Sequence, residues 1–181
     1  MTRLLSALSA ALFFTACTAS SDETSTTSDE VSTTCPQELV LTLDGYAAET
    51  LPDLVDGDFA AWHAANAERE NVETTATGLQ FKVIQPGIEN GVVPMPGEGI
   101  TAYYHGYFPN GEEFDSIYTR GEPMTHVSNG LIKGWNEALA DMKVCEARTL
   151  YVPADLAYGN GGGGRPSGTL VFHMQLLSVN R

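Results

Sequence analysis

Six segments of the chain have the residue patterns of short β-strands. In one of them Leu79, Phe81 and Val83 alternate with Gln80 and Lys82. A Pro-Asn-Gly turn signal separates the second segment from the third. The final segment is too apolar for an exposed sheet edge. The predicted strands span residues 79–84, 100–108, 113–116, 123–127, 146–152 and 169–179.

A helix is predicted over residues 131–142, because large apolar side chains recur there at helical spacing. These side chains belong to Leu131, Trp135, Leu139 and Met142. Strands before and after one short amphipathic helix imply an α+β fold. The sequence therefore predicts an antiparallel β-sheet of about five strands packed on that helix.

Residues 35–75 are predicted to form a short helical lead-in to the sheet domain. Residues 38–43 favour a short strand or an extended segment. Good helix-forming residues then follow, with Phe59 and Trp62 three positions apart. Two acidic residues are candidate N-caps of this helix, Asp56 and Asp58.

The first 16 residues have the pattern of a secretory signal peptide. Arg3 precedes an apolar run over residues 4–14 that is too short to span a membrane. The ending before Cys17 resembles a bacterial lipobox, which makes Cys17 a candidate lipidation site; ordinary cleavage nearby is the alternative. Residues 17–34 are rich in Ser, Thr and acids and are predicted to form a disordered tether.

The charge of the chain is negative and uneven. The chain holds 9 Lys and Arg against 23 Asp and Glu, for a net charge of −14. Residues 17–75 hold 13 of the acids and a single basic residue, Arg69. No cluster of basic residues occurs that could neutralise a nucleic-acid backbone or an anionic lipid surface. Nucleic-acid binding is therefore not expected.

If Cys17 carries lipid, Cys35 and Cys145 remain as an even pair in an oxidising compartment. We expect a disulfide between them, with two separate thiols as the alternative. His63 is interpreted as a helix-surface residue. No zinc or other metal site is expected, because the cysteines lack histidines at ligand spacing.

Several short runs occur in a fixed order over residues 76–181. They are Tyr104-His105-Gly106-Tyr107, Asn110-Gly111, Phe114-Asp115-Ser116, Gly121-Glu122-Pro123, Ile132-Lys133-Gly134-Trp135, Leu156-Ala157-Tyr158-Gly159 and Leu170-Val171-Phe172. Their identity and spacing resemble FKBP-type peptidyl-prolyl cis-trans isomerases. The preceding residues 77–84 resemble the bacterial envelope branch of that family. The resemblance implies an isomerase domain over residues 76–181, with the sheet wrapped round the short helix.

The resemblance also implies an apolar pocket for a substrate proline. Trp135 would form its floor, and Asp115 would face the twisting amide or orient Tyr104. Tyr158 would donate a hydrogen bond from its hydroxyl to the substrate. The implied catalytic residues are Asp115, Tyr158 and Tyr104, and the implied substrate-binding residues are Phe114, Ile132, Trp135, Phe172, Leu131, Met124 and His126. The alternative for each aromatic residue alone is ordinary core packing.

Some positions depart from the family pattern. Met124, His126 and Leu156 stand where the best-known members have aromatic residues. The loop 159–168 is shorter, rich in glycine, and lacks the apolar pair that lies over the pocket in small members. Binding of macrolide inhibitors is therefore less certain to carry over than catalysis.

The implied function is isomerisation of prolyl bonds in unfolded or nascent polypeptides of the bacterial envelope. Rotation about an amide breaks no bond, so no cofactor is expected. The alternatives are a chaperone-like binding module with vestigial activity, and an interaction protein that does not use the pocket. Anchoring to the outer membrane through lipid on Cys17 is the expected location. A monomer is expected, because the lead-in is short and interrupted by Pro and Gly.

Overall fold

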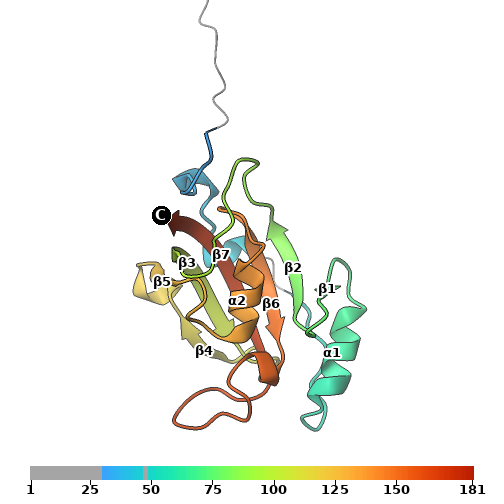
Figure 1. Ribbon diagram of the computed structural model, residues 1–181. Coiled ribbons are helices and arrows are strands. Elements are labelled where there is room, and N and C mark those ends of the chain that lie inside the picture. The colour runs from blue at the N-terminus through green and yellow to red at the C-terminus, as the bar shows by residue number, and fades with distance from the viewer. Residues whose placement is uncertain (1–29, 47–48) are drawn as a thin grey trace, which may run out of the picture.

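The computed structural model describes residues 30–46 and 49–181. Its centre is one antiparallel sheet with the strand order β1-β2-β6-β7-β3-β4, in which β5 also pairs with β3 (Figure 1). The strands are β1 (Glu73–Thr74), β2 (Gln80–Gln85), β3 (Gly99–Tyr107), β4 (Glu113–Ser116), β5 (Met124–Val127), β6 (Ala147–Val152) and β7 (Leu170–Asn180). The predicted α+β fold is confirmed. The six predicted strands are present within one residue at each end, and β1 was not predicted.

Helix α2 (Lys133–Leu139) packs on one face of the sheet and is shorter than predicted. Its N-cap is Ile132, so Leu131 and Met142 lie outside it. Met142 is nevertheless fully buried in the core. Gly134 permits the close approach, because a Cβ there would lie 2.6 Å from Val152 Cγ1 of β6. The apolar stripe was therefore identified correctly, but its ends belong to the flanking turns.

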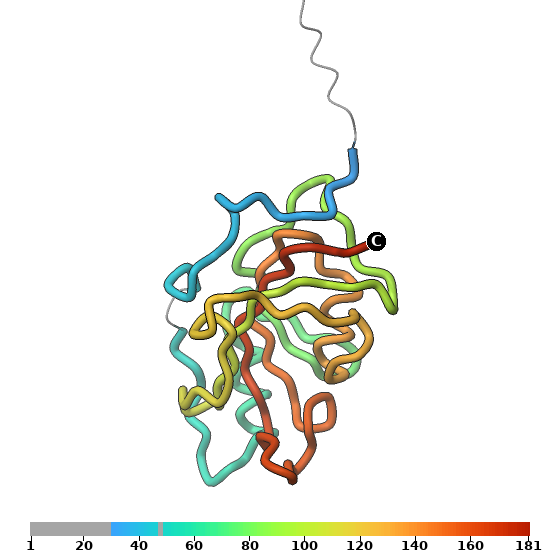
Figure 2. Tube along the Cα trace, turned by 90° about the vertical axis from the view of Figure 1, so that its left-hand side faces the viewer, coloured from blue at the N-terminus to red at the C-terminus, as the bar shows by residue number. Residues whose placement is uncertain are grey.

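The lead-in lies along the sheet face opposite α2 (Figure 2). Neighbouring residues of β7 point to opposite faces. Phe172 accordingly packs against Trp135 of α2, whereas His173 stacks on Tyr46 of the lead-in at 4.4 Å. A strand is absent from 38–43, and the extended alternative holds only in the middle of the segment, at Val40 and Thr42. The chain instead forms two 3₁₀ turns, Gln37–Leu39 and Leu43–Gly45.

A buried glutamine explains why this part of the lead-in does not add a strand. Gln175 of β7 accepts a hydrogen bond from the Leu41 N–H at 2.8 Å and donates one to the Leu39 carbonyl at 2.8 Å. These bonds satisfy backbone groups that would otherwise pair with a strand. A side chain from the sheet thus fixes the lead-in in an irregular conformation.

Helix α1 (Phe59–Ala67) ends the lead-in, and Asp58 is its N-cap. The Asp58 carboxylate accepts a hydrogen bond from the Ala61 N–H at 2.9 Å. The interpretation of His63 as a surface residue is wrong. Its ring contacts Gln80 Oε1 at 3.3 Å and Thr169 Oγ1 at 3.0 Å, and so joins α1 to β2 and to the residue just before β7.

The start of the described chain is tied to the domain. Cys35 and Cys145 form a disulfide. Ser32 exchanges backbone hydrogen bonds with Asn90 and Val92, so residues 32–34, expected within the disordered tether, are ordered. The predicted signal peptide and Cys17 lie outside the described residues. No helix in the described ranges is long and apolar enough to cross a membrane.

Candidate active site

A small apolar pocket of about 110 Å³ opens between α2 and the ends of β3, β4 and β7. Trp135, only 5 % exposed, lies at its base. Its ring meets those of Tyr104 and Phe172 edge-on, with centroids 5.1 and 5.0 Å away. The lining residues are Tyr104, Phe114, Asp115, Met124, Leu131, Ile132, Trp135, Tyr158 and Phe172. The structure thus brings together every predicted pocket residue except His126.

His126 lies on β5 with an exposed side chain. Its Nδ1 lies 2.9 Å from the Val127 N–H, which donates to it, and the residue does not line the pocket. Met124, two residues earlier on the same strand, does line it. The prediction of His126 as a pocket residue is therefore not supported by its position.

The pocket depends on a glycine in the middle of β3. A Cβ on Gly106 would lie 2.7 Å from Phe114 Cζ and 2.9 Å from Phe172 Cε1. Phe114 and Phe172 meet edge to face at 5.5 Å directly over this position. The absent side chain therefore leaves room for two aromatic walls.

Three polar groups form a closed network at the rim. The Tyr104 hydroxyl donates to Asp115 Oδ2 at 2.5 Å. Arg120 Nη2 donates to Asp115 Oδ1 at 2.8 Å and to the Tyr104 oxygen at 2.9 Å. Both carboxylate oxygens of Asp115 are thus engaged, and its side chain has little freedom to turn.

Burial and the hydrogen bond to Asp115 raise the pKa of Tyr104 to about 12. The hydroxyl therefore stays protonated at neutral pH and keeps donating to the carboxylate. Sequence reasoning missed Arg120. In the sequence, Arg120 is marked only as a basic residue five positions after Asp115. The next residue, Gly121, has a backbone φ of 78°.

Two hydrogen-bond donors at the pocket remain available. The backbone N–H of Ile132 and the hydroxyl of Tyr158 have no hydrogen-bond partner within residues 30–46 and 49–181. Tyr158 is 39 % exposed at the mouth. Both donors can therefore meet a ligand without first breaking a bond to the described protein.

An open groove of about 550 Å³ continues from the pocket. The two share Phe114, Asp115 and Tyr158. The groove is also lined by Phe108, Gly164, Arg165 and Pro166. A chain bound in the pocket would therefore run on over this surface.

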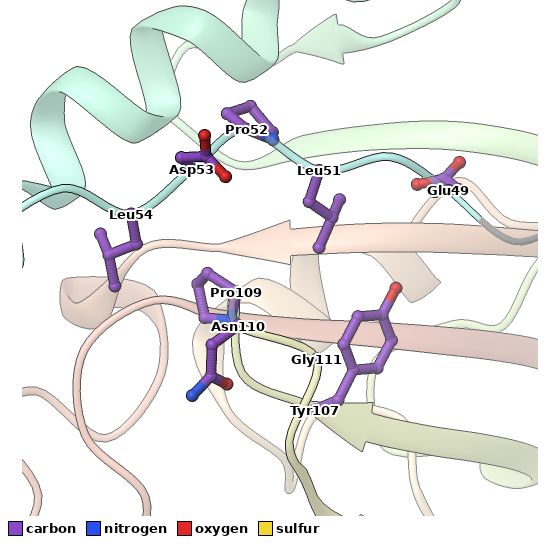
Figure 3. Close-up of a pocket in the computed structure, with 9 residues that line it drawn as sticks. All are labelled: Glu49, Leu51, Pro52, Asp53, Leu54, Tyr107, Pro109, Asn110 and Gly111. Carbon is purple, nitrogen blue, oxygen red and sulfur yellow. The ribbon is translucent and has the colours of Figure 1, made fainter.

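Another cavity, of about 520 Å³, lies between the lead-in and the turn that joins β3 to β4 (Figure 3). Leu51 and Leu54 face Tyr107 and Pro109 across it. It contains none of the predicted site residues. The carboxylate of Glu49 at its edge is already paired with Arg69 and Lys82. We therefore assign the active site to the smaller aromatic pocket.

Comparison with known proteins identifies the family of the chain. A family model for FKBP-type peptidyl-prolyl cis-trans isomerases matches residues 90–177. Peptidyl-prolyl cis-trans isomerase Mip of Coxiella burnetii is 41 % identical over 124 residues, which cover 67 % of this chain and 53 % of Mip. FkpA of Escherichia coli is 39 % identical over 115 residues, covering 62 % of this chain and 42 % of FkpA.

Solved structures show the same likeness. The crystal structure of Escherichia coli FkpA superposes with a TM-score of 0.64 at 35 % identity, covering 69 % of this chain and 59 % of that one. The crystal structure of AtFKBP13 gives a TM-score of 0.55 at 31 % identity, and the match covers 60 % of this chain and 98 % of that one. The chain spans about half the length of the curated relatives it matches. With the pocket, the ordered motifs and these matches in agreement, the chain belongs to the family of FKBP-type peptidyl-prolyl cis-trans isomerases.

Proposed function

We propose that this protein catalyses cis–trans isomerisation of the bond before proline in polypeptides. The observation that carries the proposal is the aromatic pocket over Trp135, with the Asp115 network at its rim and two free donors. The pocket volume suits a small apolar group such as a prolyl ring. Asp115, Tyr158 and Tyr104 are the proposed catalytic residues.

The barrier that must be lowered comes from the partial double-bond character of the amide, about 18–20 kcal/mol. The planar amide is more dipolar than the twisted one. An apolar, water-poor pocket therefore stabilises the twisted form relative to the planar form, which is differential binding of the transition state. Trp135 and Phe172 would enclose the prolyl ring while the preceding carbonyl rotates.

The free donors would hold the substrate backbone during this rotation. The Ile132 N–H is fixed at the start of α2, and Tyr158 lies at the mouth. Asp115, held by Tyr104 and Arg120, would place fixed negative charge beside the rotating amide. Each group acts without forming a covalent bond, so the proposed reaction requires no cofactor.

The test is a protease-coupled or NMR-exchange assay with a neutral X–Pro peptide. Asp115→Ala and Tyr158→Phe are expected to lower kcat/KM by about tenfold or more, as for loss of groups that act in the transition state. His126→Gln, outside the pocket, is the matched control. A wild-type rate equal to the thermal rate, with circular dichroism showing a folded protein, would refute the proposal.

The alternative of a chaperone-like module with vestigial activity is not favoured by these relatives, which are named as isomerases. It would gain support if both variants bound unfolded clients as well as the wild type and no isomerisation were detected. Proline-containing unfolded polypeptides are the proposed substrates. Macrolides are proposed inhibitors. Loop 159–168 lacks the apolar pair, so the pocket alone would have to bind them.

We also propose a bacterial envelope location, with lipid on Cys17 as the anchor to the outer membrane. The signal-like residues 1–16 support it, as does the Cys35–Cys145 disulfide, which persists in oxidising compartments. A relative from Legionella longbeachae, 36 % identical, is named an outer membrane protein. Labelling with a fatty-acid analogue should mark the wild type and spare Cys17→Ser; equal labelling of both would refute the anchor.

We further propose a lead-in over residues 35–75, an isomerase domain over 76–181, and a monomer in solution. The lead-in packs against the face of its own sheet, at His173 and Gln175, which supports the monomer. Sedimentation equilibrium should give the mass of one chain. A mass of two chains at micromolar concentration would contradict the proposed state.

A further inference from the structure

The groove beside the pocket carries a positive charge with no partner. Arg165 makes no ion pair with any residue in the described ranges. The other cation of this site, Arg120, is bound to Asp115. Among the described residues, Arg165 is thus an unpaired positive charge beside the pocket of a protein whose net charge is −14.

The loop holds Arg165 in place. Arg165 precedes Pro166, which restricts its backbone to extended conformations. Its N–H donates to the Gly162 carbonyl at 3.3 Å, and the Gly168 N–H donates to the Gly159 carbonyl at 3.1 Å to close the loop. The Arg165 guanidinium lies over the Tyr158 ring, 5.8 Å from its centroid. The glycines thus build a turned loop that returns a cation to the mouth of the pocket.

The remaining lining of the groove matches a side chain that ends in a negative charge. Phe108 and Phe114 provide an apolar wall, with their rings 5.1 Å apart. The carboxylate of Asp115 is paired with Arg120 at 2.8 Å, which reduces, without removing, its repulsion of an incoming acid. An arginine fork pairs well with a carboxylate.

We infer that Arg165 is a specificity residue, which favours substrates with an acidic side chain next to the proline and disfavours those with a basic one. The inference rests on the proposed function of the pocket. With the prolyl ring over Trp135, the adjacent residue is only about 3.3 Å further along an extended chain, within reach of the shared groove. Because the groove is open, the ion pair is partly solvated and its effect is modest.

The experiment compares peptides that differ only in Glu, Gln or Lys beside the proline. One series places the variable residue before the proline and one places it after. In at least one series the wild type is expected to show kcat/KM two- to fivefold higher for Glu than for Gln, and lower still for Lys. In 0.5 M salt the preference should shrink, because the groove is exposed to solvent.

The variant Arg165→Gln should bring the Glu-to-Gln ratio to about one, and Arg165→Lys should restore part of it. Lys143→Gln is the matched control. It removes one positive charge near Glu89, away from the groove, and should keep the wild-type ratio. A ratio that Arg165→Gln leaves unchanged in both series would overturn the inference, as would equal loss in Lys143→Gln.

A second readout separates this inference from the proposed reaction. Titration of the same peptides, followed by Trp135 fluorescence, measures binding without turnover. If the protein binds the Glu peptide more tightly in an Arg165-dependent way but accelerates no peptide, the proposed function fails and the specificity role stands. If all peptides turn over and bind equally, the specificity role fails and the proposed function stands.

Discussion

Gly106 is the position where a single residue type decides the shape of the pocket. It lies in β3 under the rings of Phe114 and Phe172, both within 3 Å of where a Cβ would be. Those contacts are to rigid aromatic rings that also form the pocket walls. Any larger residue must therefore displace the walls.

Gly106→Ala is expected to lower the free energy of unfolding by about 1–3 kcal/mol, as overpacking does in a dense core. The displaced rings should also reduce kcat/KM. Chemical denaturation and the isomerase assay measure the two effects. Gly99→Ala on the same strand is the control, because the nearest atom to its Cβ would be Asn180 Cβ at 3.2 Å, a milder contact than the 2.7 Å at Gly106. Equal stability of the two variants would contradict the packing argument.

Helix α1 shows how an element is fixed by both its own cap and its contacts. Trp62 is 1 % exposed, and its indole N–H donates to the Pro52 carbonyl at 2.8 Å. Asn66 is fully buried and donates to Gln80 Oε1 at 2.8 Å. The helix therefore docks on the sheet through two anchors: Trp62 packs against Tyr151 of β6, and Asn66 bonds to Gln80 of β2.

Asp58→Ala is expected to cost about 1 kcal/mol of stability, because the Ala61 N–H loses its acceptor at the start of α1. Thermal denaturation measures the loss. The control is Asp56→Asn, which removes the other acid near the cap and suits the φ of 50° at that position. If Asp56→Asn costs as much as Asp58→Ala, the capping role of Asp58 is wrong.

Besides Gln175 and the contacts of α1, three further ties join the lead-in to the sheet and hold the whole molecule together. The Cys35–Cys145 disulfide is the first, and the stacking of Tyr46 on His173 is the second. The third is Glu49, which contacts Arg69 and Lys82 at 3.3 Å and accepts a hydrogen bond from Tyr151 at 2.5 Å. Burial by itself raises the pKa of Glu49, but this hydrogen bond and the two cations outweigh burial and lower it.

The double variant Cys35→Ser, Cys145→Ser should lose about 2–5 kcal/mol of stability, because the bridge spans a separation of 110 residues. Urea denaturation measures the loss, and wild type treated with a reductant should match the variant. Neither cysteine lines the pocket, so isomerase activity at low temperature should survive. Unchanged stability would show that the remaining contacts hold the lead-in in place without the disulfide.

Acid should weaken the same interface. Burial and the neighbouring His105 lower the pKa of His173 from 6.5 to about 4. The unfolded chain takes up this proton near pH 6.5 and the folded chain only near pH 4, so stability falls as the pH drops between these values. The shift corresponds to about 3 kcal/mol. Of the groups around the ring, Glu49 raises the pKa of His173, and Tyr46 and Tyr107 stay neutral at acid pH.

Stability measured from pH 7 to 4 should show this slope in the wild type and a flatter one in His173→Gln. His126→Gln, a change at an exposed histidine, should keep the wild-type slope. Burial also lowers the pKa of His105, where Glu113 lies 3.3 Å from its ring, and of His63. These two histidines leave a residual slope of the same sign in His173→Gln. Parallel profiles for all three proteins would contradict the assignment.

Local patterns in the sequence determined much of this protein. The pattern of hydrophobic and polar residues identified the strands. Successive side chains of a strand point to opposite faces of the sheet, whichever strand lies beside it. The resemblance carried by the ordered motifs identified the family and nine of the ten predicted pocket residues, because the motifs keep the pocket residues at fixed spacings along the chain. The N-cap was narrowed to Asp56 or Asp58 by residue type alone.

Only the tertiary structure decided the rest, because it depended on groups distant along the chain. Gln175 kept residues 38–43 from forming a strand, and His63 contacts Thr169, a residue 106 positions later in the chain. Arg120 reaches the rim because the 3₁₀ turn Tyr118–Arg120 folds the chain back toward Asp115. Contacts between side chains that are distant along the chain produce no repeating pattern in the local sequence. The sequence therefore determined the elements and the pocket residues, whereas tertiary packing decided which charged groups form pairs.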